Sequence, residues 1–114
     1  MSGFIDGVRC KDILIDPGAT SNFVRRDWAL SNRLRVEALR EPLEVKLAND
    51  DTVDRVTGGI VVQSLSAQGS TAPCTLVVME RLSHHVILGM PWLKRANVTI
   101  SCGEVMRWNG ARLN

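Results

Sequence analysis

Short apolar runs separated by turn-forming residues dominate the chain and predict strands. Gly3–Ile5 and Val8–Ile15 flank Asp6-Gly7, and an Asp-Gly pair between apolar runs is a strong β-hairpin signal. Within the second run, Ile13-Leu14-Ile15 is continuously apolar, which is typical of a strand buried on both faces. This strand should end at Asp16-Pro17-Gly18-Ala19, because adjacent proline and glycine favour a turn.

A longer hairpin is predicted over residues 43–62. Apolar and charged positions alternate over residues 43–47, which is the period of two expected of a strand with one buried face. The cluster Asn49-Asp50-Asp51-Thr52 favours a turn, and an apolar run resumes at residues 59–62. Gly58-Gly59 would allow the second strand of this hairpin to bend or bulge.

The remaining pattern adds short strands and little helix. Strands are expected at 74–79, 86–88, 98–100 and 105–108, with a turn at 68–70 and a final hairpin formed by the last two strands. Met90–Arg95 should form a short helix with proline in its first turn, and residues 21–33 favour a short helix or an irregular loop. The whole chain, residues 1–114, is therefore predicted to be one all-β domain, a small closed barrel with one short C-terminal helix.

Composition and charge exclude several classes of protein. The chain has 114 residues, of which 45% are hydrophobic, and this length fits a single domain with a modest core. Its 14 basic and 12 acidic residues form no long block of one sign, so nucleic acid is not an expected partner. No apolar stretch approaches the ~20 residues that span a bilayer, and no signal-peptide pattern is visible, so no membrane association is expected.

The cysteines and histidines do not indicate a metal site. Cys10, Cys74 and Cys102 lie far apart without a C-x-x-C motif, so we expect partly buried thiols in a reducing, cytoplasmic environment. His84-His85 would point to opposite faces of a strand, which disfavours a shared metal ion and favours two surface loop residues. Neither a metal nor an organic cofactor is expected.

The candidate chemistry centres on Asp16, a carboxylate placed after three apolar residues and before a tight turn. Burial raises the pKa of a carboxyl group, so an ionised aspartate there needs partners or a second carboxyl that shares its proton. Taken alone, the Asp-x-Gly pattern occurs in many chains by chance and favours an aspartate that caps a turn after a strand. A second motif far downstream, Val86-Ile87-Leu88-Gly89-Met90-Pro91-Trp92-Leu93, narrows the interpretation.

Together the segments 13–23 and 86–93 resemble the retropepsin-like aspartic proteases, in particular those of gypsy-type LTR retrotransposons. Those enzymes carry two hydrophobic residues followed by Asp-(Ser/Thr)-Gly-Ala-(Thr/Ser), then a polar hairpin, then Ile-Leu-Gly-Met-x-Trp-Leu. The resemblance extends over residues 3–108. It implies an endopeptidase that cleaves its own Gag-Pol-type polyprotein, in the cytoplasm or inside retrotransposon particles. Because the chain holds one such motif, and the chemistry uses two carboxylates that share a proton, a homodimer is implied, with one Asp16 from each subunit.

The resemblance also implies roles for residues around the catalytic candidate. Pro17, Gly18, Ala19 and Thr20 would form the active-site loop, with Leu88 and Gly89 packed beneath it. The substrate-binding residues would be Ser21 beside this loop, a flap tip and one pocket wall. The flap tip would comprise Ala48, Asn49, Asp50, Asp51, Thr52 and Val53, and the pocket wall would be Ile87. Ordinary core packing accounts for Ile87 and Leu88 equally well.

Pro17 departs from the family pattern. Relatives carry serine or threonine there, and its hydroxyl and amide tie the two active-site loops together across the dimer axis. Proline has neither donor. At ~0.5–1.5 kcal/mol per hydrogen bond, losing two donors per subunit would weaken the dimer by roughly 2–6 kcal/mol. The alternative function is therefore a catalytically impaired dimerisation or peptide-binding module with the same fold.

Overall fold

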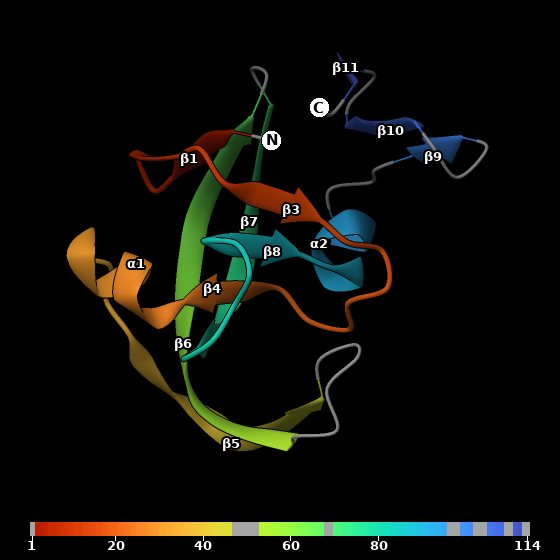
Figure 1. Ribbon diagram of the computed structural model, residues 1–114. Helices are drawn as coiled ribbons and strands as arrows, with labels where there is room; N and C mark the ends of the chain where they lie inside the picture. Colours follow the sequence, from red (N-terminus) through yellow and green to blue (C-terminus); the bar gives the residue numbers. More distant parts are fainter. Residues whose placement is uncertain are drawn as a thin grey trace.

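The computed structural model describes residues 2–46, 53–67, 70–95, 99–101, 105–108 and 111–112 (Figure 1). Two short helices are α1 (Arg26–Ser31) and α2 (Met90–Arg95). The strands are β1 (Gly3–Ile5), β2 (Val8–Cys10), β3 (Ile13–Ile15), β4 (Phe23–Arg25), β5 (Glu37–Lys46), β6 (Val53–Ala67), β7 (Ser70–Met79), β8 (Val86–Leu88), β9 (Thr99–Ser101), β10 (Val105–Trp108) and β11 (Ala111–Arg112).

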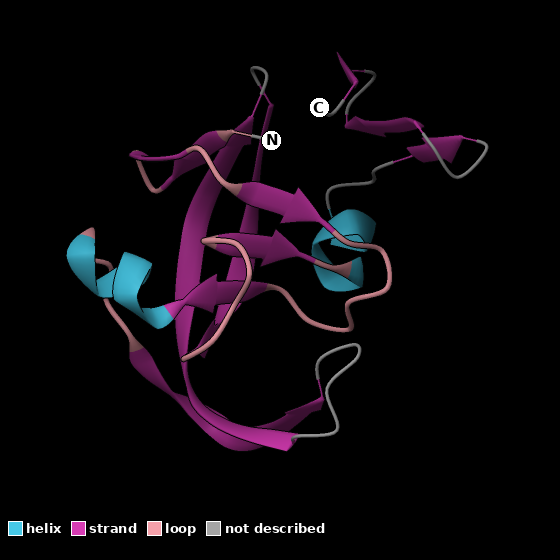
Figure 2. Cartoon of the chain, in the orientation of Figure 1, coloured by secondary structure: helices cyan, strands magenta, loops and turns pink. Residues whose placement is uncertain are grey.

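Most strands belong to one curled sheet that forms a nearly closed barrel (Figure 2). Its order is β2-β1-β6-β7-β4-β8-β3, and β5 pairs with β6 outside this path. The pairs β3–β8 and β4–β7 are parallel, whereas the other pairs are antiparallel. A second sheet has the order β11-β10-β9 and contains the final hairpin that the sequence predicts. The all-β prediction is confirmed, but the expectation of one helix was incomplete, because α1 forms as well as α2.

The N-terminal hairpin forms at the predicted turn. Asp6 (φ 46°) and Gly7 (φ 82°) both adopt left-handed backbone conformations, as a two-residue type I′ turn requires. The prediction of one strand over Val8–Ile15 was wrong, since the chain leaves β1 after Cys10 and starts β3 at Ile13 on a different neighbour, β8. Because β3 ends the sheet order, only Ile13 is fully buried, and the expectation of burial on both faces was too strong.

The predicted long hairpin is β5–β6, which is longer at both ends than residues 43–62. Its register slips between the pairs Ala38–Gly58 and Leu43–Val56, so β5 bulges there. The adjacent Gly59 makes room for the bulge: a Cβ at this position would stand 2.7 Å from Cδ2 of Leu39. The bulge therefore lies in β5, opposite the two glycines, and not in their own strand as the sequence predicted.

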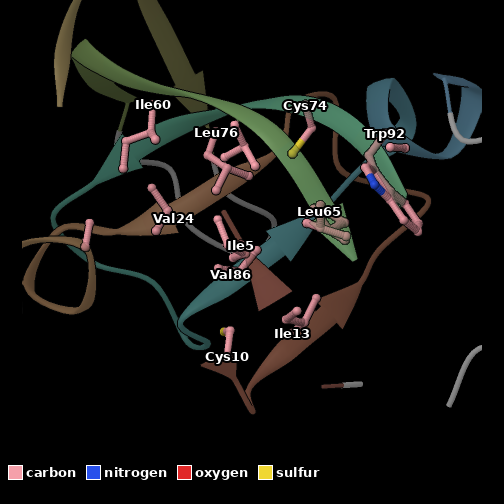
Figure 3. Close-up of a cluster of buried hydrophobic side chains, with 14 of the residues drawn as sticks. Ile5, Cys10, Ile13, Val24, Ile60, Leu65, Cys74, Leu76, Val86 and Trp92 are labelled. Atoms are coloured by element: carbon pink, nitrogen blue, oxygen red, sulfur yellow. The ribbon is translucent and has the colours of Figure 1, made fainter. Parts of the chain in front are cut away.

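Buried side chains form two hydrophobic clusters. The larger fills the barrel and includes Ile5, Leu65, Leu76 and Trp92 (Figure 3). The smaller lies between the β5–β6 hairpin and the barrel, and its buried members are Phe23, Val45, Val56, Val77, Met79, Leu82 and Ile87. Strand β8 joins the two clusters because its side chains alternate: Val86 and Leu88 enter the larger cluster and Ile87 the smaller.

Further sequence expectations can be placed on this fold. Trp92 is fully buried and Trp28 is partly buried against the larger cluster. Cys10 and Cys74 are buried thiols. The side chains of Trp108 and Cys102 lie outside the described part of the chain. Neither described helix is long and apolar enough to cross a membrane.

Candidate active site

The loop that follows β3 begins with the turn that the sequence predicts. The Asp16 backbone N–H donates to the Leu88 carbonyl oxygen (2.9 Å), which continues the pairing of β3 with β8. The chain then reverses, and the Ala19 N–H donates to the Asp16 carbonyl oxygen (3.0 Å). Pro17 occupies the second position of this four-residue turn, where proline is favoured and the turn uses no N–H. Within one subunit, Pro17 therefore fits the loop without strain.

The carboxylate of Asp16 is held by its own loop and remains partly exposed. Its Oδ1 accepts a hydrogen bond from the Gly18 N–H (2.9 Å), a charge-assisted contact when the carboxyl is ionised. A Cβ at Gly18 would lie 3.2 Å from the same oxygen, so a larger residue would crowd the carboxylate. Pro17, Gly18 and Thr20 are exposed, and Ala19 is half-buried. The loop thus presents one oriented carboxylate at the surface of the subunit.

Beneath the loop lies the junction between β8 and α2. Three consecutive residues, Leu88–Met90, form hydrogen bonds with the loop. The Leu88 carbonyl oxygen accepts from the Asp16 N–H, as described above. The Gly89 N–H donates to Asn22 Oδ1 (3.0 Å), and the Met90 N–H donates to the Ala19 carbonyl oxygen (2.9 Å). Residues 88–90 of the second sequence motif therefore fix the backbone of the loop that contains the first motif, and we call these three residues the template.

Gly89 allows this close approach because it has no side chain. A Cβ there would stand 2.6 Å from the carbonyl oxygen of Ala19 and would press against that of Ser21. Both obstacles are backbone atoms, so neither could rotate away. The packing of Leu88 and Gly89 beneath the active-site loop agrees with what the resemblance implies.

Asn22 is a site residue that the sequence argument missed. Only 5% of its surface is exposed, and its side-chain oxygen accepts hydrogen bonds from the backbone N–H groups of Gly89 (3.0 Å) and Trp92 (3.2 Å). Its side-chain nitrogen donates to the Thr75 carbonyl oxygen (3.3 Å). Asparagine after a turn is so ordinary that nothing local in the sequence distinguishes it, and its partners come from distant segments.

The other predicted substrate-binding residues are placed only in part. Ile87 is buried in the smaller cluster, where Leu14 and Ala19 also pack, so it lies between the active-site loop and the β5–β6 hairpin. Ser21 is half-buried and lines an open pocket of about 270 Å³ with Asn22, Cys74, Thr75, Val77, Pro91 and Trp92. Ala48–Thr52 lie outside the described residues, and Val53 begins β6 opposite Lys46.

The two histidines are not simple surface residues. His84 Nδ1 lies 2.6 Å from Oδ1 of Asp12, and the His85 N–H donates to Asp12 Oδ2 (3.2 Å). The ring of His85 stacks on Trp28 with 5.8 Å between ring centroids. Both histidines lie in the loop before β8 and are half-buried, so the loop interpretation is confirmed. Their contact with Asp12 follows from the pairing of β3 with β8, which brings together segments 72 residues apart. Within the described ranges, no cluster of three or more potential metal-ligating side chains occurs.

The barrel, the Asp16 turn and the glycine-bearing template beneath it define a retropepsin-like aspartic protease domain. The family model of the PEG10/RTL1 protease domain matches residues 12–111, and this chain belongs to that family. The family assignment made from the two sequence motifs is thereby confirmed. No curated protein matches the chain.

Solved structures with the same fold include proteases from several sources. The retroviral protease-like domain of Ddi1 from Leishmania major matches with a TM-score of 0.70 and 21% identity, over 99% of this chain and 91% of that one. A retropepsin-like aspartic protease from Rickettsia conorii matches with a TM-score of 0.63 and 19% identity, over 89% and 74% of the two chains. The EIAV protease, complexed with the inhibitor HBY-793, matches with a TM-score of 0.62 and 14% identity, over 82% and 83%. At these identities the likeness establishes the shared fold.

Proposed function

We propose that this chain is one half of a homodimeric aspartic endopeptidase, with Asp16 of each subunit meeting at a two-fold axis. The observation that carries the proposal is the partly exposed Asp16 carboxylate, held by Gly18 at the end of β3. One subunit supplies one such carboxylate, whereas the chemistry needs two, and membership of a protease-domain family supports this use of the residue.

The proposed reaction follows from two carboxyl groups that share one proton. Two carboxyl groups so close together cannot both be ionised, so one group acts as a base and the other as an acid. The ionised carboxylate takes a proton from a bound water molecule, which attacks the carbonyl carbon of the peptide bond. The protonated carboxyl donates a hydrogen bond to the carbonyl oxygen as negative charge develops there. The tetrahedral intermediate then collapses: the C–N bond breaks, and the carboxyl that took the proton from water gives it to the leaving nitrogen. None of these steps requires a metal ion or an organic cofactor.

We propose an extended polypeptide as the substrate, held between the active-site loop and the β5–β6 hairpin. The position of Ile87 beside that loop, within an apolar cluster that reaches the hairpin, supports a preference for an apolar substrate side chain. Closure of the hairpin tip over the peptide would exclude water and order the substrate. The natural substrate would be a Gag-Pol-type polyprotein that contains the domain, processed in the cytoplasm or in retrotransposon particles.

Peptidase assays and sedimentation on the same preparation test this function. We expect cleavage of denatured protein that is fastest at mildly acidic pH, is blocked by a statine-type transition-state mimic, and disappears in Asp16→Asn. A stable dimer that cleaves no denatured protein at any pH would instead support the non-catalytic module. A strict monomer at every accessible concentration would contradict the endopeptidase and the dimerisation module, and would leave a peptide-binding module as the alternative.

A further inference from the structure

We infer that Asn22 is the positioning residue of the catalytic loop. It holds the loop on the β8–α2 junction, and this inference rests on the proposed endopeptidase function. Among the described residues, Asn22 is the buried polar or charged one, with 5% of its surface exposed. Burying an amide costs free energy unless its hydrogen bonds are made. A buried asparagine with three side-chain hydrogen bonds therefore indicates a specific structural role.

The contacts of Asn22 tie three separate segments to the end of the loop. Its side-chain oxygen accepts from Gly89, just before α2, and from Trp92 within that helix. Its side-chain nitrogen donates to Thr75 of β7. Its backbone carbonyl accepts from the Val77 N–H (2.8 Å). The far end of the loop is thus fixed to the strand and the helix that flank it.

These partners require a side chain that accepts twice and donates once. Asparagine does so in one plane, because its oxygen has two lone pairs and its nitrogen carries hydrogens. An ionised aspartate can only accept, so one of its oxygens would face the Thr75 carbonyl oxygen without a hydrogen between them. An apolar residue would leave two N–H groups and one carbonyl without these partners.

Asn22 acts on Asp16 through the template rather than by contact. The Gly89 N–H that it binds lies between the Leu88 carbonyl, which holds the Asp16 N–H, and the Met90 N–H, which holds the Ala19 carbonyl. A shift of Gly89 would therefore move both anchors of the turn that carries the carboxylate. Loss of the Asn22 amide should lower kcat through misplacement of Asp16, because small errors in reacting geometry are costly.

The substitution Asn22→Asp makes this role sensitive to pH. A protonated carboxyl reproduces the native pattern, since its hydroxyl donates to Thr75 and its carbonyl oxygen accepts from Gly89 and Trp92. Burial and the facing carbonyl oxygen of Thr75 disfavour the ionised form, whereas the N–H groups of Gly89 and Trp92 favour it. At a position with 5% exposure we expect desolvation to dominate and to raise the new group's pKa above its ordinary value near 4. Among the residues that line the adjacent pocket, Cys74 is the titratable one, and an ordinary thiol stays protonated below about pH 8. Asp16 lies on the same loop and is common to variant and parent.

The decisive measurement is the ratio of kcat for Asn22→Asp to kcat for the parent domain, between pH 4 and pH 8. Taking the ratio removes any pH dependence that the variant and the parent share. We expect a ratio near one at the acidic end and a fall of at least about tenfold, with a one-proton slope, as the introduced carboxyl ionises. The matched control is Asn32→Asp, because the Asn32 amide also donates to a backbone carbonyl, that of Trp28 (2.8 Å), but at the end of α1. Its ratio should not vary with pH.

A second readout does not depend on activity. In the parent domain, the backbone N–H groups of Gly89 and Trp92 should exchange with solvent as slowly as those of buried strands. In Asn22→Asp, their NMR shifts should titrate with the same midpoint as the kcat ratio. Fast exchange of both N–H groups, a ratio that is flat with pH, or failure of the variant to fold at pH 4 would each overturn the inference. If the parent domain had no peptidase activity, only the proposed function would be overturned. The exchange and the NMR titration of the Gly89 and Trp92 N–H groups would still test the positioning role of Asn22.

Discussion

The Asp12 carboxylate and the His84 ring form a close pair at the end of β3 opposite Asp16, with 2.6 Å between Oδ1 and Nδ1. Backbone contacts also bind both ends of this strand to β8. The Val86 N–H donates to the Asp12 carbonyl oxygen (3.2 Å), and the Asp16 N–H donates to that of Leu88 (2.9 Å). The Asp12–His84 pair therefore fastens the start of the strand that ends at the catalytic candidate.

This pair predicts how stability should depend on pH. The hydrogen bond from His84 holds the pKa of Asp12 below its ordinary value of 3.8, and the N–H of His85 acts in the same direction. A carboxyl group whose pKa is lowered in the folded state stabilises the fold at pH values above its ordinary pKa. This contribution is lost as the pH falls through the lowered pKa. Asp12→Asn should therefore cost stability at pH 7, and the difference from the parent should shrink below about pH 4.

We expect this cost to be at most about 1 kcal/mol, since the two side chains are 36% and 40% exposed and solvent screens the pair. Urea unfolding at pH 7 and pH 3 measures it. Glu80→Gln is the control, because its ion pair with Arg26 is more exposed and should contribute almost nothing. A difference between Asp12→Asn and the parent that is equal at both pH values would contradict the prediction.

Restoring a hydroxyl and an amide hydrogen at position 17 should strengthen the proposed dimer. Pro17 fits the turn within one subunit, so any effect of Pro17→Thr on affinity should come from contacts across the axis. At ~0.5–1.5 kcal/mol per recovered hydrogen bond, the dimer dissociation constant should fall at least about tenfold, and activity per chain should rise at low concentration. Sedimentation over a dilution series measures this change.

The control for that substitution is Pro73→Thr, because Pro73 is exposed on β7 and lies outside both the active-site loop and the β5–β6 hairpin. It should leave both the dissociation constant and the activity unchanged. Equal effects of the two substitutions, or no gain in affinity from Pro17→Thr, would mean that our account of Pro17 is wrong.

A side chain at position 89 should disrupt the active-site loop. The added methyl group of Gly89→Ala would meet the backbone oxygens of Ala19 and Ser21, which can move only if the loop moves. We expect a loss of about 1–3 kcal/mol in unfolding free energy, as for other overpacked sites, together with loss of activity. Thermal and urea unfolding provide the stability measurement.

Gly58→Ala is the matched control, because a Cβ there would lie 3.0 Å from Cγ1 of Val36, an exposed and movable side chain. This substitution should cost little. If Gly89→Ala were as stable and as active as Gly58→Ala, this would refute the claim that the active-site loop packs too closely on Gly89 to admit a side chain.

A smaller side chain at position 87 distinguishes core packing by Ile87 from a role as the wall of a substrate pocket. Because 7% of its surface is exposed, Ile87→Val should destabilise the fold by about 0.5–1.5 kcal/mol as an ordinary core change. If Ile87 also forms the wall of a substrate pocket, kcat/KM should shift toward peptides with a larger apolar side chain. Val24→Ala is a core control, since Val24 is fully buried in the larger cluster. It should lower stability without changing the order of preferred substrates.

Much of this protein followed from the sequence because the signals were local. The Asp-Gly turn, the Pro-Gly turn after Ile15 and the apolar run ended by Gly89 each depend on backbone preferences of a few adjacent residues. The two motifs around Asp16 and Gly89 pointed to the family, which the match over residues 12–111 establishes. The short helix α2 was also predicted from Pro91 in its first turn.

Tertiary structure decided the features that depend on which strands become neighbours. A strand over Val8–Ile15 was the natural local interpretation, but β3 leaves β1 to pair with β8, and this choice brings Asp12 to His84. The same rearrangement of distant segments gives Asn22 its partners at Thr75, Gly89 and Trp92. Hydrogen-bond partners far apart in sequence have no periodic pattern that could reveal them, because sheet topology alone sets their distance in space.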